Sequence, residues 1–219
     1  MNLKEYILNE IKELTLLNSI KEAQKLFKGF PITHIPIVEN GQLLGCISES
    51  DTQTIEDNSA SISEHSHLID FFFADENITL LELIKLFADN DCNMMPALNK
   101  EKQYLGYFEL SDVLDAFASS PFLYNNGVEI VASKSKKEYS ASEISQIVES
   151  NNGKLLGMYI SSETSETTQV TVKISSEDIN EVIQTFRRYN YNIVSLHQDD
   201  FYLQDLKDRS DYLQKYLDM

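Results

Sequence analysis

Residues 45–51 read GCISESD, and residues 106–112 read GYFELSD. Both stretches begin with Gly and end with Asp six positions later, but Ser48 of the first is replaced by Glu109 in the second. A pattern that returns at this distance predicts one structural unit present twice in the chain.

The sequence on either side of these stretches repeats as well. SIKEAQKLF (19–27) aligns with TLLELIKLF (79–87), and THIPIVENGQLLG (33–45) aligns with NMMPALNKEKQYLG (93–106). Apolar residues recur at helical spacing in the first pair. Ser19 with Glu22, and Thr79 with Glu82, have the spacing of capping boxes at helix starts. Two apolar runs around a polar turn follow, so each copy is predicted to be helix, β-hairpin, helix.

This arrangement resembles a tandem pair of cystathionine-β-synthase (CBS) domains, the Bateman module. The resemblance rests on the helix SIKEAQKLF, the HIPIV strand and the GCISESD stretch, and it covers roughly residues 1–120. It implies a first CBS repeat over residues 1–60 and a second over 61–120. The stretch FFF (71–73) is predicted to be a buried strand that opens the second repeat.

The pattern changes after residue 120. SSPFLYNNG carries Pro, Asn and Gly, which predicts a linker over residues 121–127. Residues 128–200 then have the order β-α-β-β-α-β of the ferredoxin-like plan, and they resemble an ACT domain in order and length. The turn after the first strand, SKSKKEY, lacks the Gly usual in amino-acid-binding ACT domains. The whole chain is thus expected to be an α+β protein, similar to acetoin-utilisation-type CBS proteins.

Residues 201–219 are predicted to form one more helix with a partial apolar stripe. Such a helix either packs back on its own domain or contacts another subunit, and periodicity alone does not separate these alternatives.

The resemblance also implies a binding site. In CBS proteins that bind nucleotides, the residues matching Asp51 and Asp112 accept hydrogen bonds from the ribose hydroxyls, and the residue matching Ser48 donates to a phosphate. Glu109 stands where the second hydroxyl would be, and its negative charge repels a phosphate. Any nucleotide is therefore expected in the first-repeat cleft. The HIPIV strand adds the remaining candidates: His34, Ile35 and Pro36.

Each of these residues also has a purely structural interpretation. Ser-x-x-Asp at a helix start is an ordinary capping arrangement, and His34 is equally interpreted as a partly buried structural residue. The stretch EHSH (64–67) lacks partners at metal-ligand spacing, so we expect a solvated loop there. No sequence motif indicates a catalytic site.

The amino-acid composition limits which molecules this protein is expected to bind. The 219-residue chain has a net charge of −17 and 42% hydrophobic residues, which suits a folded acidic protein but not a nucleic-acid-binding one. Residues 1–126 contain no Arg, so ATP is a poorer ligand than a nucleoside or monophosphate such as AMP. Apolar runs are too short to cross a membrane. Cys46 and Cys92 suit reduced core thiols better than a disulfide, for which their spacing gives no argument, and we expect a cytoplasmic protein.

Together these observations predict a non-catalytic regulatory protein. Its CBS pair would bind an adenosine-type ligand, its ACT-like domain would relay the signal, and the chain would form a homodimer through helices that flank the sheets. The alternative is a structural assembly module that binds no small molecule.

Overall fold

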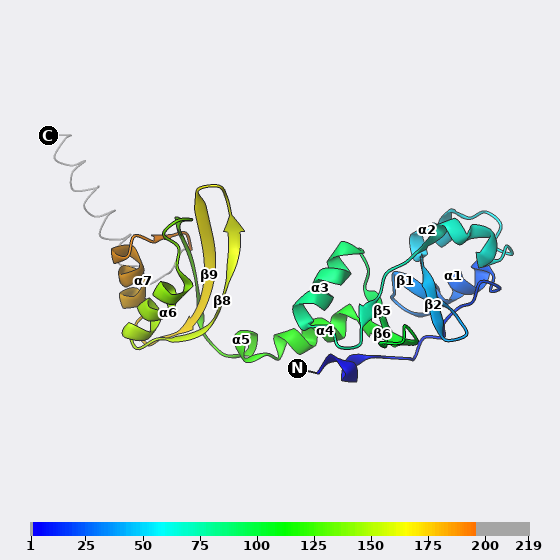
Figure 1. Cartoon of the computed structure of the whole chain (residues 1–219), viewed down its shortest axis with the longest axis horizontal. Coiled ribbons are helices and arrows are strands. Elements are labelled where there is room, and N and C mark those ends of the chain that lie inside the picture. The colour runs from blue at the N-terminus through cyan, green and yellow to red at the C-terminus, as the bar shows by residue number, and fades with distance from the viewer. Residues whose placement is uncertain (1, 196–219) are drawn as a thin grey trace. The chain divides into compact units, whose positions relative to one another are not determined.

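The structure, a computed structural model, describes residues 2–195. The chain divides into two compact units, Met1–Ser119 and Ser120–Met219, called unit 1 and unit 2 below (Figure 1). The helix predicted for residues 201–219 lies outside the described residues. No helix within residues 2–195 is long and apolar enough to cross a membrane.

Unit 1 contains the predicted helix–hairpin–helix module twice. The first copy comprises α1 (Ile20–Gly29), β1 (His34–Glu39), β2 (Gln42–Ser48) and α2 (Glu49–Thr54), and the second comprises α3 (Leu80–Asp89), β5 (Met94–Leu98), β6 (Tyr104–Glu109) and α4 (Leu110–Ala118). Shorter elements complete the unit: the 3₁₀ helices η1 (Leu3–Tyr6) and η2 (Ile62–Leu68), and the strands β3 (Ile69–Asp70) and β4 (Ala74–Asp75).

The helix starts confirm the predicted capping boxes. Ser19 caps α1 and Thr79 caps α3, and in both the glutamate three positions later bonds back to the backbone N–H of the capping residue. Each box satisfies backbone donors that would otherwise lack partners at the first turn.

The two repeats exchange strands. β3, which precedes the second repeat, pairs with β2 of the first, with Ile69 opposite Ile47. Reciprocally, the segment before the first repeat pairs with β6 of the second: Leu8 and Tyr107 exchange both backbone hydrogen bonds, at 2.8 and 2.9 Å. Each hairpin is therefore completed by chain that leads into the other repeat.

The motif glycines allow this exchange. Gly45 has a φ of +147° and Gly106 a φ of +141°, a region that side chains rarely adopt. A Cβ on Gly45 would lie 2.7 Å from the carbonyl oxygen of Asp70 on β3, and one on Gly106 would collide with the carbonyl oxygen of Leu8. The exchanged strand passes so close to the hairpin that only glycine fits.

The predicted strand at residues 71–73 is wrong. β3 ends at Asp70 and belongs to the sheet β1-β2-β3, whereas β4 begins at Ala74 and belongs to the sheet β4-β5-β6. The three phenylalanines lie where the chain crosses between the sheets, and Phe71 is 62% exposed while Phe72 is buried. A segment that changes sheets there pairs with neither sheet.

Unit 2 has the predicted order β-α-β-β-α-β after one helical turn. Its elements are α5 (Pro121–Tyr124), β7 (Val128–Ser135), α6 (Ala141–Ser150), β8 (Lys154–Glu163), β9 (Thr167–Ser175), α7 (Ile179–Arg188) and β10 (Asn192–Ile193). All neighbouring strands are antiparallel, in the order β10-β7-β9-β8. Helices α6 and α7 lie on one side of this sheet and share its core (Figure 1).

The stretch expected as a linker has structure of its own. Pro121 occupies the first turn of α5, as suits its fixed φ. The Phe122 ring lies where a Cβ on Gly157 of β8 would be, and the buried Lys173 of β9 donates from Nζ to the carbonyl oxygen of Leu123 at 3.0 Å. α5 is thus held against the sheet of unit 2.

We predict that Gly45→Ala lowers the free energy of unfolding by at least the roughly 1–3 kcal/mol expected of backbone strain, because it adds a collision with Asp70. Gly41→Ala is the matched control for strain alone, since Gly41 has a φ of +77° and open space around it. Gly29→Ala, also in open space at the end of α1, should be neutral or stabilising by up to about 1 kcal/mol.

Urea unfolding followed by far-ultraviolet circular dichroism measures this, because the chain has no Trp for fluorescence. Equal losses in Gly45→Ala and Gly41→Ala would contradict the proposed role of the close approach.

A second prediction concerns the boundary between the units. Limited proteolysis should cut first between Ser119 and Gly127 and leave two stable fragments. Lys173→Met, which loses the bond to Leu123, should speed cleavage within Pro121–Tyr124. Lys154→Met on β8 is the control, and identical rates in both variants would show that the lysine does not hold α5.

Candidate functional site

An open cleft of about 380 Å³ lies in unit 1 where the first hairpin meets α2. Its lining residues come from both repeats: Thr33, His34, Ser48, Glu49, Ser50, Asp51, Asp70, Asn90 and Asp91. Three of the residues predicted from sequence, His34, Ser48 and Asp51, therefore lie in one cleft.

Strand pairing brings these three together. His34 begins β1 and lies directly opposite Ser48, which ends β2. The Glu49 N–H donates to the carbonyl oxygen of Thr33 at 2.8 Å and closes this end of the hairpin. α2 begins at Glu49, so Asp51 falls in its first turn beside the cleft.

Ser48 is the N-cap of α2. Its Oγ accepts a hydrogen bond from the Asp51 N–H at 3.0 Å and donates to Asp51 Oδ2 at 2.6 Å. The capping role considered from the sequence is thus present, and the hydroxyl proton already has an acceptor. A contact from Ser48 to a phosphate would require this bond to be exchanged.

His34 is fixed in the wall of the cleft. The residue is 8% exposed, its Nδ1 lies 2.9 Å from Thr33 Oγ1, and its ring packs edge-on against Phe72 with 5.3 Å between centroids. Burial lowers the pKa of His34 below its ordinary value, against the opposing effect of Asp70, Asp51 and Asp91.

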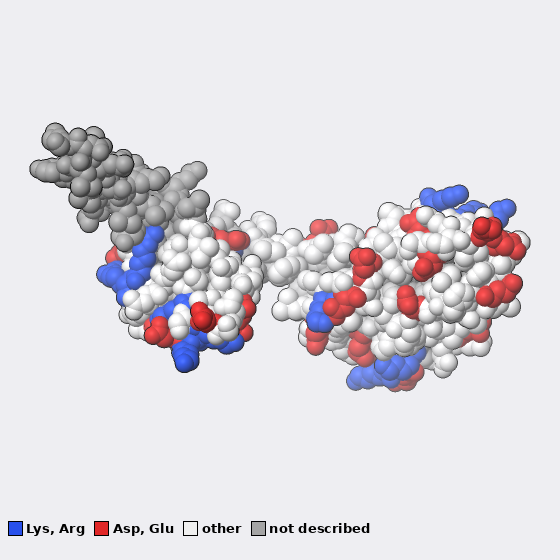
Figure 2. All heavy atoms as spheres, turned by 90° about the horizontal axis from the view of Figure 1, so that it is seen from above, with Lys and Arg blue, Asp and Glu red and all other residues white. Residues whose placement is uncertain are grey.

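The cleft is acidic. Four carboxylates line it, those of Glu49, Asp51, Asp70 and Asp91, while its lining includes no Lys or Arg. On the face of unit 1 that Figure 2 shows, Asp and Glu are spread over the surface and Lys gathers at a few places. The electrostatics of the cleft therefore disfavour an anion and suit a neutral or cationic group.

The corresponding position in the second repeat differs. Met94 lies opposite Glu109 in the β5–β6 pair, as His34 lies opposite Ser48. Glu109 is the N-cap of α4 but makes no side-chain cap bond, and the partly exposed Asp112 lies in the first turn of that helix. Asp112 therefore belongs to this other position and not to the cleft at His34.

The remaining predicted residues do not line the cleft. Ile35 is fully buried in a core cluster and Pro36 is buried on β1. Sequence reasoning missed Asp70 and Asp91. In the pairing of strands Leu8 is the counterpart of Asp70, because Leu8 faces Tyr107 as Asp70 faces Cys46, and Asp91 aligns with Pro31, so neither carboxylate is repeated. Asp91 follows α3 at a φ of +46°, and Asp70 arrives on the exchanged strand.

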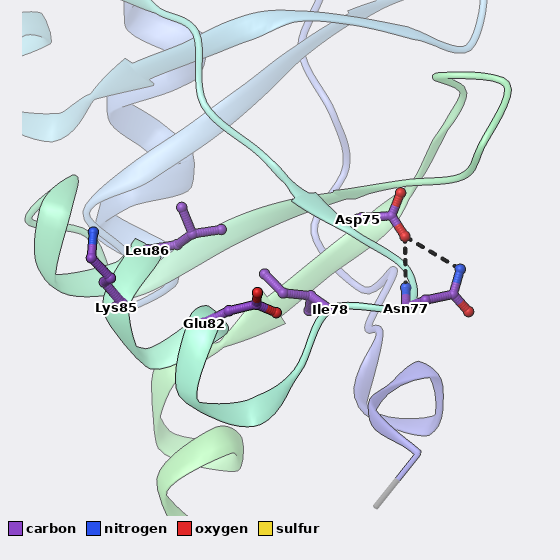
Figure 3. A pocket seen from close by; sticks show the side chains of 6 residues that line it. All are labelled: Asp75, Asn77, Ile78, Glu82, Lys85 and Leu86. Atoms are coloured by element: carbon purple, nitrogen blue, oxygen red, sulfur yellow. Dashed lines mark hydrogen bonds between the residues drawn. The ribbon is translucent and has the colours of Figure 1, made fainter.

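A second cavity, of about 460 Å³, lies between β4 and α3 (Figure 3). Its polar groups are engaged with neighbours: Asp75 accepts from the N–H and Nδ2 of Asn77, Glu82 completes the α3 capping box, and Lys85 pairs with Asp89. Figure 3 shows Ile78 and Leu86 between them. This cavity is a weaker candidate than the cleft.

The EHSH stretch forms part of η2, where the rings of His65 and His67 lie 6.2 Å apart. Within residues 2–195, no three or more His, Cys, Asp or Glu side chains are grouped so that they could hold a metal ion.

Comparison with known proteins agrees with the duplicated module. Residues 14–52 and 65–119 match the CBS domain family. Unit 1 carries a tandem pair of CBS domains.

The chain is 21% identical over 114 residues to an uncharacterized protein of Methanocaldococcus jannaschii, covering 52% of this chain and 43% of that protein. It is 23% identical over 111 residues to inosine-5'-monophosphate dehydrogenase of the same organism, covering 50% and 22%. The chain thus spans less than half the length of these curated relatives.

Solved structures with some likeness include a CBS domain pair/ACT domain protein from Thermotoga maritima, with 17% identity, a TM-score of 0.48, and 53% of this chain and 96% of that chain covered. CBSX2 in complex with AMP has 13% identity and a TM-score of 0.46, covering 53% and 95%. The cytosolic domain of the Mg²⁺ channel MgtE in complex with ATP has 22% identity and a TM-score of 0.43, covering 51% and 46%.

The buried His34 of this CBS pair predicts a pH dependence of stability. Its pKa is lower in the folded protein than the ordinary value of about 6.5, so the unfolded chain binds the proton more readily. The free energy of unfolding is therefore unaffected by His34 above the ordinary pKa, and it decreases as the pH falls from the ordinary pKa toward the lower pKa of the folded protein. His34→Met, which copies Met94 of the second repeat, should reduce the loss of stability between pH 7.5 and pH 5.5.

The exposed His67 gives the control His67→Met. Urea unfolding at several pH values measures the difference, and parallel curves for the wild type and His34→Met would contradict the prediction.

Proposed function

We propose that this protein is a non-catalytic regulator whose CBS pair binds an adenosine-type ligand in the cleft at His34, Ser48 and Asp51. The ligand is a nucleoside or a monophosphate in preference to ATP. The single observation that carries this proposal is the meeting of His34, Ser48 and Asp51 in a cleft lined by four carboxylates and by no Lys or Arg.

Asp51 suits the ribose of such a ligand. Its Oδ2 accepts a hydrogen bond from Ser48 Oγ, which orients the carboxylate. Within the described residues its Oδ1 has no hydrogen-bond partner. An ionised carboxylate oxygen accepts well from a vicinal diol.

The negative charge of the cleft predicts an order of affinity among adenosine-type ligands. Each added phosphate brings negative charge toward Glu49, Asp70 and Asp91, and no lining Lys or Arg offsets it. Affinity is therefore expected to fall from adenosine to AMP to ATP, whereas a cationic adenosine derivative such as S-adenosylmethionine is not penalised.

We propose that unit 2 is an ACT-like domain that relays a signal and does not bind a second ligand. Beside the turn after β7, Lys134 Nζ pairs with Glu143 Oε2 at 2.7 Å and lies 4.5 Å above the centre of the Tyr191 ring. The Lys134 side chain is only 8% exposed. The polar groups there already satisfy one another.

The second candidate function is an assembly module that binds no small molecule. Exposed apolar side chains on the helices of unit 1 favour it: Leu81 on α3 is 70% exposed and Leu114 on α4 is 47% exposed. Such side chains are available for a homodimer contact through helices.

Binding calorimetry at one salt concentration with adenosine, AMP, ATP and S-adenosylmethionine tests the proposal. Asp51→Asn should weaken adenosine binding, because a charge-assisted hydrogen bond is worth roughly 1.5–3 kcal/mol, or about ten- to a hundredfold in affinity. The amide retains an acceptor for Ser48.

Asp112→Asn is the matched control, since Asp112 holds the same place in the second repeat, and it should change little. Equal losses in the two variants would show that the site is misplaced. No binding of any of the four compounds would favour the assembly module.

A further inference from the structure

The hydrogen bonds beside the cleft fix which nitrogen of His34 carries its proton. They begin with the Asn93 side chain, whose Nδ2 donates to the carbonyl oxygen of Pro31 at 2.7 Å and whose Oδ1 accepts from the Thr33 N–H at 2.8 Å. These two backbone groups, one acceptor and one donor, orient the amide. Its oxygen is therefore the atom that faces the Thr33 hydroxyl, 3.1 Å away.

The Thr33 hydroxyl has one proton and two lone pairs. Its oxygen accepts from the Asn93 N–H at 3.0 Å, and it also lies 3.1 Å from Asn93 Oδ1 and 2.9 Å from His34 Nδ1. Asn93 Oδ1 can only accept, so the hydroxyl proton points to it. His34 Nδ1 then donates to the remaining lone pair. Only this arrangement gives each of these groups a partner of the opposite kind.

The imidazole of His34 is neutral at pH 7.5. Burial lowers the pKa of His34 below its ordinary value, although the carboxylates of Asp51, Asp70 and Asp91 act in the opposite direction. A neutral imidazole carries one proton, and here the Thr33 hydroxyl holds that proton on Nδ1. Nε2 is therefore left as a hydrogen-bond acceptor.

Nε2 of His34 opens into the cleft. Within the described residues it has no hydrogen-bond partner, and it is not one of the side-chain atoms that are buried without a partner, which are Tyr104 Oη, Ser120 Oγ and Asn180 Oδ1. Water therefore reaches Nε2, and His34 lines the cleft. The edge-on contact with Phe72 holds the plane of the ring. The cleft thus contains one neutral acceptor among its four carboxylates.

The places of His34 and Asp51 suit the two ends of a nucleoside. Ser48 faces His34 across the β1–β2 pair, so these side chains lie on the same face of the hairpin, and Ser48 Oγ donates to Asp51 Oδ2. Ser48 therefore lies between the imidazole on β1 and the carboxylate on α2. Hydroxyls bond more strongly to a charged acceptor than to a neutral one, which assigns the ribose to Asp51 and leaves Nε2 for the base.

We propose that His34 Nε2 accepts a hydrogen bond from an amino group on the base of the bound nucleoside, so that His34 selects an aminopurine over an oxopurine. This role rests on the proposed function, since it requires a nucleoside in the cleft. The amino group of adenosine supplies a proton to Nε2. The oxo group at the same position of inosine is itself an acceptor and faces the Nε2 lone pair, which leaves both acceptors without a donor.

Binding calorimetry of the full chain at pH 7.5 tests this role with adenosine, inosine and purine riboside, which has no substituent at the amino position. The wild type should bind adenosine roughly five- to tenfold more tightly than purine riboside, as expected of one hydrogen bond, and inosine more weakly still. His34→Met removes the acceptor and should bind the three nucleosides with nearly equal affinity. His67→Met, at an exposed histidine of η2, is the control and should keep the preference.

Two substitutions of Thr33 test how the imidazole is held. Thr33→Val loses the hydroxyl that keeps the proton on Nδ1 and should lose the preference, whereas Thr33→Ser keeps the hydroxyl and should retain it. Circular dichroism checks that the variants fold.

Nitrogen NMR of the wild type with isotope-labelled histidine gives a readout that needs no ligand. The His34 signals, identified by their absence from His34→Met, should be those of a neutral imidazole protonated on Nδ1. Protonation on Nε2 overturns the inference and leaves the proposed function standing. So does adenosine binding without preference over the other two nucleosides, or a preference that His34→Met retains. If none of the three nucleosides binds, the inference and the proposed function both fail.

Discussion

The exchange of strands between the two repeats is the constraint on which the rest of unit 1 depends. Leu8 pairs with Tyr107 and Ile69 with Ile47, so neither hairpin is complete without chain that leads into the other repeat. The cores follow the same rule: Met94 and Tyr107 of the second repeat pack with the first-repeat residues Ile20 and Ile35. The duplicated motif requires glycine at Gly45 and Gly106, because the backbone of the exchanged segment occupies the position where a Cβ would lie. A helix–hairpin–helix unit of this size would leave one hairpin edge and much of its apolar surface in water if it stood alone.

The same exchange gives the cleft its composition. His34, Ser48 and Asp51 come from the first repeat, whereas Asp70 and Asp91 arrive with chain that leads into or belongs to the second. Beside the cleft the repeats are joined by a reciprocal pair of bonds, in which the Thr33 N–H donates to Asn93 Oδ1 at 2.8 Å and the Asn93 N–H donates to Thr33 Oγ1 at 3.0 Å. A ligand in the cleft would touch both repeats at once, and its binding would depend on their spacing. Such dependence is a physical requirement for a site that regulates.

How far the sequence predicts this structure depends on whether the signal is local. The capping boxes, the helix periodicity and the hairpin turns act within a few residues, and the alignment of the two copies reinforces each of them, so they could be predicted. Phe71–Phe73 could not, because three apolar residues suit a strand locally and only the crossing between two sheets prevents it. Asp70 and Asp91 were missed for a related reason, since only tertiary pairing brings them to His34. Ser48 was ambiguous in sequence because a cap and a phosphate donor have the same pattern, and its bonds to Asp51 show the capping role.

The two units differ in how the outer strands of their sheets are paired. In unit 1 the outer strands are short, and duplication supplies the partner from within the same chain, so each copy covers an edge of the other. Among the described residues, unit 2 has a single β-α-β-β-α-β set and no second copy that could cover its edges, and these edges are unequal because β10 contributes two residues and β8 ten. β9 is a central strand, and β8 pairs along most of its length. The outer side of β8 then has no strand partner within residues 2–195, so the pairing that completes the hairpin also creates a long edge.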